Sequence, residues 1–169
     1  MTALQQVKTA VVDALEGAGL TAMSAYSEEQ LKKYTTAVTA VGLREMRLTE
    51  SGAMEYLGEK YDAVRDATLE VYGKKMTLVL SLDVYAPRTL GAEGCEEAAE
   101  EITQVMTSAL PSGLRVKELA WESTEWDKTY GMFRLSASAE YEAYFVAETA
   151  EETAVFTDFI LRGVVRAHE

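Results

Sequence analysis

The sequence has very few of the residues that most often carry out chemistry in proteins. Cys95 and His168 are the only cysteine and the only histidine among 169 residues. His168 lies beside a chain end, where order is usually lowest, which disfavours a Ser-His-Asp or Cys-His catalytic arrangement. Structural zinc sites draw mainly on Cys and His, and one of each does not complete a tetrahedral set. We therefore expect no catalytic residues, no metal, no cofactor and no enzyme activity.

Long apolar runs and clusters of cationic residues are also missing. Residues 1–20 carry Lys8, Asp13 and Glu16 among apolar side chains, which excludes an uninterrupted signal or membrane segment there. The formal net charge of −12 opposes binding to the phosphates of a nucleic acid. A single cysteine forms no intrachain disulfide, as is common in reducing compartments. These features predict a soluble, intracellular protein that binds neither nucleic acid nor membrane.

The overall composition is that of a folded domain. Hydrophobic residues make up 48% of the chain and charged residues 26%, far from the composition of disordered proteins. A chain of this length needs one hydrophobic core. We expect a single domain over residues 1–169, in which residues 155–169 form either a C-terminal strand or an arm.

Apolar residues recur at helical spacing in two segments. Residues 2–17 form one amphipathic pattern, which Gly17 and Gly19 end. Residues 93–109 form a second pattern with acidic first turns, a placement that suits the positive end of a helix dipole. The apolar face expected of this second helix consists of Cys95, Ala98, Ala99, Ile102, Val105, Met106 and Ala109.

Alternating apolar and polar residues predict strands in the rest of the chain. The expected elements are a strand over 34–48 with a bulge at Gly42, a hairpin within 51–66, a central strand over 67–85, strands over 114–127 and 130–147, and a final strand over 155–166. The predicted fold class is therefore α+β: a mainly antiparallel mixed sheet with an N-terminal helix and a second helix packed on it.

The segment 130–147 has the clearest alternation. One face carries Phe133, Leu135, Ala137, Ala139, Tyr141, Ala143, Phe145 and Ala147, and the other carries Arg134, Ser136, Ser138, Glu140 and Glu142. Fully extended, this strand spans about 55 Å, which is long for a compact domain of this size. We expect it either to bend near residues 136–139 or to project from the domain.

Several residues suggest a site but have simpler interpretations. Cys95 belongs to an apolar helix face, so a buried core cysteine is favoured over a reactive thiol. The turn Gly91 to Gly94 precedes a helix, but no lysine follows it and the adjacent glutamates would repel a phosphate.

Two carboxylate pairs and the two tryptophans also have simpler interpretations than a site. Glu122 with Glu125, or Glu140 with Glu142, resemble an acid–base pair, but among 28 acidic residues a solvated sheet face explains them better. Trp121 and Trp126 have odd separation and so face opposite sides of a regular strand. We expect one in the core and the other at a rim or anchoring a partner protein.

Several stretches spread over most of the chain carry a family resemblance. They are Val41-Gly42-Leu43, Glu55-Tyr56-Leu57-Gly58, Leu80-Ser81-Leu82-Asp83-Val84-Tyr85-Ala86-Pro87-Arg88, Gly91-Ala92-Glu93-Gly94-Cys95, and Trp126-Asp127 followed by Gly131-Met132-Phe133-Arg134-Leu135. They resemble small prophage tail proteins of Gram-positive bacteria, which are similar in layout to phage tail-terminator and tail-completion (minor tail) proteins. None of these stretches is a catalytic motif, and the resemblance assigns no site residues.

The resemblance implies a structural role in virion assembly. Tail-terminator proteins form a ring that caps the tail tube and joins it to the head. The expected partners are therefore further copies of the chain in a ring, with a hexamer as one candidate, together with the tail-tube protein and head–tail joining proteins. The implied location is the bacterial host cytoplasm during assembly and the tail of the finished virion.

Two other functions stay open at the level of the sequence. One is a small-ligand-binding module or enzyme whose pocket uses carboxylates and the tyrosines Tyr56, Tyr85, Tyr141 and Tyr144. The other is a bacterial interaction domain unrelated to phage.

Overall fold

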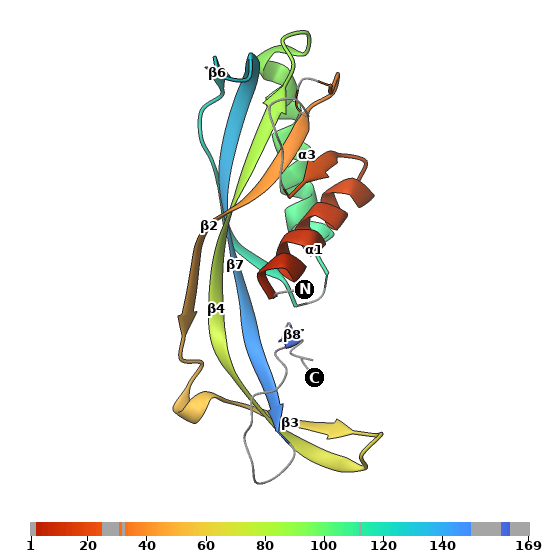
Figure 1. Cartoon of the computed structure of the whole chain (residues 1–169), viewed down its shortest axis with the longest axis vertical. Helices are drawn as coiled ribbons and strands as arrows, with labels where there is room; N and C mark the ends of the chain where they lie inside the picture. The colour runs from red at the N-terminus through yellow and green to blue at the C-terminus, as the bar shows by residue number, and fades with distance from the viewer. Residues whose placement is uncertain (1–2, 25–30, 32, 112, 150–159, 163–169) are drawn as a thin grey trace.

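The computed structural model describes residues 3–24, 31, 33–111, 113–149 and 160–162 (Figure 1). Its elements are α1 (Ala3–Gly17), β1 (Thr21–Met23), β2 (Val38–Thr49), the short 3-10 helix η1 (Ala53–Glu55), β3 (Tyr56–Asp62), β4 (Ala67–Ala86), α3 (Gly91–Ser108), β5 (Arg115–Trp121), β6 (Glu125–Asp127), β7 (Met132–Thr149) and β8 (Ile160–Arg162). Figure 1 shows an elongated molecule in which both helices lie on one side of a long, twisted sheet.

The described strands form one eight-stranded sheet. Its main path runs β1-β2-β4-β7-β5, while β3 pairs with β4, and β6 and β8 pair with β7. The short β1–β2 pairing is parallel and the other pairings are antiparallel. The predicted class is confirmed: an α+β fold with a mainly antiparallel mixed sheet, an N-terminal helix and a second helix packed on it.

The β4–β7 pairing forms the spine of the sheet. It runs from Glu70 opposite Thr149 to Ala86 opposite Phe133 without a register shift. The predicted strand over 67–85 is therefore confirmed as central, with β2 on one side and β7 on the other. β7 is likewise continuous through residues 136–139, and Figure 1 shows its second half extending beyond α3. Projection, one of the two predicted alternatives, is therefore observed.

The main core lies between the helices and one face of the sheet, which we call the helix face. Leu78, Leu80 and Leu82 of β4 are almost completely buried there, and so are Val7, Val11 and Leu15 of α1. From β7 the helix face receives Leu135, Ala137, Ala139, Tyr141 and Ala143, as the alternation predicts. The side chains of Phe145 and Ala147, assigned to the same face, lie outside the described part.

The helix α3 buries the predicted stripe, from Cys95 to Met106. Ala109 is an exception, because the helix ends at Ser108 and Ala109 is exposed. Trp121 links β5 to α3, because its indole N–H donates a hydrogen bond to the Thr103 hydroxyl oxygen at 3.1 Å. A smaller cluster lies on the opposite face of the sheet, where Leu31 and Met132 pack with Tyr85.

The bulge in β2 differs from its predicted position. The register shifts between Leu43 and Glu45, so the extra residue is Arg44, whereas Gly42 pairs regularly with Ser81. A Cβ atom built on Gly42 would lie 2.6 Å from the Ser81 hydroxyl oxygen, so this glycine permits a close approach of side chain to backbone. Gly42 is therefore a position where a side chain would clash with Ser81, and the bulge lies at Arg44 instead.

Other boundaries also differ from prediction. The strand expected over 34–48 begins only at Val38, and the strand expected over 114–127 is split into β5 and β6 around residues 122–124. The hairpin expected within 51–66 is confirmed in part, because β3 pairs with the start of β4. Of the final strand over 155–166 the structure describes only β8, which pairs with β7, and the remainder lies outside the described residues.

The face assignment of β4 predicts unequal effects of two neighbouring substitutions. Leu78→Asp should lower the free energy of unfolding by more than about 3 kcal/mol, because it removes core contacts and buries a carboxylate. Thr77→Asp is the control, since Thr77 points to the opposite face, where it lies opposite Arg47 and Glu142. Urea denaturation followed by circular dichroism measures both. Equal losses would contradict the face assignment.

Candidate protein interface

The exposed apolar side chains gather at one end of the molecule. Nine large hydrophobic residues are exposed among the described residues, and seven of them lie between Leu43 and Val64. These seven are Leu43, Met46, Leu48, Met54, Tyr56, Tyr61 and Val64. They lie on the second half of β2, which runs beside the middle of the sheet, and on η1, β3 and the turn that follows, at the end of the sheet away from α3 in Figure 1. The other two are Leu90, which directly precedes α3, and Trp126 of β6, and both elements lie toward the opposite end in Figure 1.

Leu43, Met46 and Leu48 form the first part of this surface, which we call the apolar strip. The bulge at Arg44 inserts one residue, so the side chains that point to the helix face have odd numbers before it and even numbers after it. Leu43, Met46 and Leu48 therefore share the helix face. They pair with Leu80, Leu78 and Met76 of β4, in that order. The β4 residues are almost completely buried, whereas the strip is 44%, 49% and 46% exposed. The helices therefore cover the middle of the helix face and leave its outer row open.

The backbone beside the apolar strip is open as well. β1 pairs with β2 only at Val38, Thr39 and Ala40, and β3 pairs with β4. Among the described residues, no strand pairs with the outer edge of β2 between Leu43 and Thr49. An edge with an exposed apolar face is a surface to which another strand or subunit can bind.

Residues 50–72 form the second part, which we call the hairpin arm. At its tip the Asp62 carboxylate accepts hydrogen bonds from the backbone N–H groups of Val64 at 2.9 Å and Arg65 at 3.3 Å, and the Tyr61 hydroxyl donates to Asp66. These bonds lower the pKa of the Asp62 carboxyl, the Val64 N–H having the largest effect. The turn they stabilise leaves Val64 96% exposed.

The base of the hairpin arm is strained. Met54 and Glu55 have φ values of 55° and 60°, a left-handed conformation that non-glycine residues adopt at a cost of order 1 kcal/mol. Met54 is also 87% exposed. Lys74 pairs with Glu55 at 2.9 Å, and the Tyr56 and Tyr72 rings meet edge to face, so the kink is held by specific contacts. Strain that exposes an apolar side chain is typical of a binding surface.

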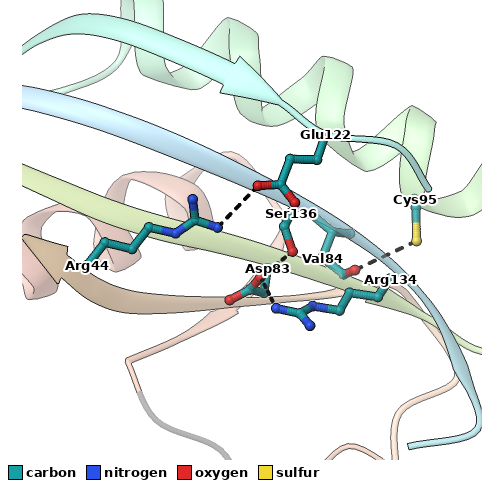
Figure 2. Close-up of polar contacts among 7 residues, drawn as sticks. All are labelled: Arg44, Asp83, Val84, Cys95, Glu122, Arg134 and Ser136. Carbon is teal, nitrogen blue, oxygen red and sulfur yellow. Dashed lines mark hydrogen bonds and ion pairs between the residues drawn. The ribbon is translucent and has the colours of Figure 1, made fainter. Parts of the chain in front are cut away.

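The opposite face of the sheet, which we call the polar face, carries internally paired charges. Figure 2 shows its buried carboxylate, Asp83, which accepts hydrogen bonds from Ser136 at 2.5 Å and Arg134 at 2.9 Å. The Arg134 guanidinium also lies 5.9 Å from the centre of the Tyr85 ring. This network joins β4 to β7. We interpret it as structural, because the Arg134 guanidinium and the Ser136 hydroxyl both donate hydrogen bonds to the Asp83 carboxylate.

Two of the carboxylates noted in the sequence, Glu122 and Glu142, form ion pairs with cationic side chains. Glu122 lies 3.6 Å from Arg44 across the sheet (Figure 2). Glu142 accepts hydrogen bonds from Lys117 and, at 3.2 Å, from Lys75. These bonds, led by that from Lys117, hold the pKa of Glu142 below its usual value. Such ion pairs belong to a solvated sheet face, as the sequence indicates.

The four tyrosines of the alternative ligand pocket lie in different parts of the fold. Tyr141 is buried in the main core, where its hydroxyl contacts the Met106 sulfur at 3.0 Å and burial raises its pKa. Tyr85 is buried in the smaller cluster on the other side of the sheet. Tyr56 lies at the base of the hairpin arm, and Tyr144 lies opposite Lys75 on β7. The fold does not bring these four side chains into one pocket.

Cys95 and the two tryptophans occupy the environments expected from the sequence. Cys95 is fully buried, and its thiol lies 3.7 Å from the Val84 carbonyl oxygen (Figure 2). Burial raises its pKa to about 11. Trp121 packs on the core, whereas Trp126 is 41% exposed and rests against Phe133.

One cleft of about 550 Å³ opens beside the first turns of α3. Its lining includes Thr21, Thr36, Thr89 and the carboxylates of Glu93, Glu97 and Glu101. Gly94 is needed there for packing, since a Cβ atom would lie 2.7 Å from the Leu90 Cβ. The acidic lining opposes a phosphate. Within the described ranges no three Cys, His, Asp or Glu residues gather as a metal site, and no helix is long and apolar enough to cross a membrane.

Sequence reasoning missed the apolar strip and the hairpin arm. The signal for the strip was the change of apolar phase, from Val41 and Leu43 to Met46 and Leu48, which an inserted residue explains. Isolated apolar residues among charges, such as Val64, marked the arm. Comparison with known proteins adds no identification: no protein-family model matches the chain, and no curated protein matches it.

The buried thiol predicts slow alkylation of the native protein. With a pKa of about 11 and no exposed surface, Cys95 should react with iodoacetamide at about pH 8 at least a hundredfold more slowly than in urea. Intact-mass spectrometry over time measures both rates. Comparable rates would show that Cys95 is accessible.

The lowered pKa of Glu142 predicts a pH-dependent contribution to stability. Because the folded pKa lies below the unfolded value, the contribution is present above about pH 4.5 and is lost as the pH falls through the folded pKa. Glu142→Gln should lower stability at pH 7 by about 1 kcal/mol or less, since the pair is partly exposed. The difference between variant and wild type should shrink toward about pH 3 in thermal melts. A difference that grows toward low pH would contradict the assignment.

Proposed function

We propose that this protein is a structural component of a phage or prophage tail, resembling a tail terminator, which caps or completes the tail tube through protein–protein contacts. One observation carries the proposal: seven of the nine exposed large hydrophobic residues among the described residues lie on the outer strand β2 and on the hairpin at the end of the sheet that extends beyond the helices (Figure 1). The sequence resemblance suggests which assembly the extension serves. In this proposal the protein acts in the host cytoplasm during assembly and resides in the virion tail afterwards.

The lengths of the elements explain why a partner is needed. The 20 residues of β4 span about 65 Å, whereas the 18 residues of α3 and the 15 of α1 span about 27 Å and 22 Å. Neither helix reaches along more than about half of the sheet. A neighbouring subunit is therefore the most economical cover for the apolar strip.

The apolar strip suits a contact between copies of the chain. Beside it on the same edge are Arg44, Glu45 and Arg47, so the local charge is mixed and two copies do not repel there. The β5 and β8 side forms the other side of the sheet. A contact between two different edges is head-to-tail, and head-to-tail contacts close into rings when the rotation per subunit allows it. A hexameric ring is the candidate that the resemblance suggests.

The proposal predicts that self-association depends on the apolar strip. Leu48→Asp should weaken ring formation by about tenfold or more, because it places a carboxylate in an apolar contact. Thr49→Asp is a matched control on the neighbouring residue, which faces the other side of β2. Multi-angle light scattering across concentration and salt, with and without purified tail tube, measures assembly.

Two results would overturn this proposal. The first is a wild-type protein that stays monomeric in every condition and does not bind the tube. The second is an assembled wild type for which Leu48→Asp and Thr49→Asp behave alike, which would place the self-contact elsewhere on the surface.

A further inference from the structure

The hairpin arm differs from the apolar strip in its charge. Residues 50–72 contain only two cationic side chains, Lys60 and Arg65, and they contain six anionic ones. The anionic residues are Glu50, Glu55, Glu59, Asp62, Asp66 and Glu70. The exposed apolar residues Met54, Tyr61 and Val64 therefore lie within an acidic rim.

The tip of the hairpin arm is organised before any partner binds. Asp62 accepts from two backbone N–H groups of the turn, and the Tyr61 hydroxyl bonds to Asp66 across it. Tyr72 bonds to Glu70 at 2.5 Å farther along the arm. A side chain presented by an ordered turn loses little conformational freedom when it binds, which favours affinity.

We propose that the hairpin arm docks a different protein, whose receiving surface is an apolar pocket with a cationic rim. This inference rests on the proposed function for the identity of that protein, the tail tube. Val64 at the tip is the residue that enters the pocket. The carboxylates around it meet Lys and Arg side chains of the partner.

A second copy of the chain is a poor receiver for the hairpin arm. The net charge of the chain is −12, and the outer face of α3 adds Glu93, Glu96, Glu97, Glu100 and Glu101. Cationic residues of the polar face already form ion pairs with carboxylates of the same chain. These residues are Arg44, Arg47, Lys75, Lys117 and Arg134. Because like charges across an interface oppose binding, this charge distribution disfavours docking of the acidic arm on a second copy.

The test measures binding of the full chain to tail tube purified from the phage encoded by the same genome. Val64→Asp should weaken binding by about tenfold or more, because it adds charge at the anchor. Leu90→Asp is the matched control, as Leu90 is a half-exposed apolar residue at the other end of the molecule. Circular dichroism melts confirm that both variants fold.

A second pair of variants tests the acidic rim. Glu50→Lys with Glu59→Lys should weaken tube binding several-fold at ~0.05 M salt, and the difference should shrink at ~0.5 M salt, where charges are screened. Glu96→Lys with Glu100→Lys makes the same change of net charge on α3 and should have little effect.

The outcomes separate the inference from the proposed function. Wild type that does not bind the tube overturns both. Wild type that binds, with Val64→Asp and the rim variant binding equally well, overturns the inference alone and leaves the tail function standing. If Val64→Asp instead abolishes self-association without changing tube binding, the arm is a contact between copies and the inference is wrong.

Discussion

The unbroken pairing of β4 with β7 is the constraint on which the rest of the structure depends. From Glu70 opposite Thr149 to Ala86 opposite Phe133 the ladder has no register shift, so the two strands form one long, stiff ribbon. The two helices are too short to cover a ribbon of this length. One half therefore becomes a conventional core between sheet and helices, and the other half extends beyond the helices as sheet and hairpin (Figure 1). The exposed apolar surface follows the outer row of this sheet along β2 and continues onto the hairpin arm.

Charge divides the surface of the molecule into regions with different uses. On the polar face, cations and carboxylates pair within the chain, as at Asp83 with Arg134, and leave little net charge to attract a partner. The outer face of α3 and the hairpin arm hold unbalanced carboxylates instead. The apolar strip lies between these regions with charges of both signs beside it. This distribution supports the two proposed contacts, one between copies along β2 and one with a cationic partner at the hairpin arm.

Sequence patterns revealed the fold but only part of the surface. The helix over 93–109 and the strand over 67–85 were predictable because each repeats its apolar residues over many positions, which local periodicity alone determines. The bulge at Arg44 was not predictable, because a register shift depends on the partner strand β4 as much as on β2 itself. The split between Trp121 and Glu125 likewise depends on how β5 and β6 meet β7. The exposure of Leu48 could not be predicted either, because an apolar residue in a strand is normally expected in the core. Its exposure follows from where the helices lie on the sheet, which the sequence of β2 does not contain.

We propose that other subunits cover the extended half of the sheet when the protein functions. Hydrogen–deuterium exchange of the free protein and of the protein bound to tail tube tests this most directly, because it reports on the backbone amides of each segment. If other subunits cover this half, exchange slows on assembly in residues 43–49 and 50–72, with little change at the Leu90 and Trp126 end. Slowing confined to that opposite end, with unchanged exchange along β2 and the hairpin arm, would contradict it.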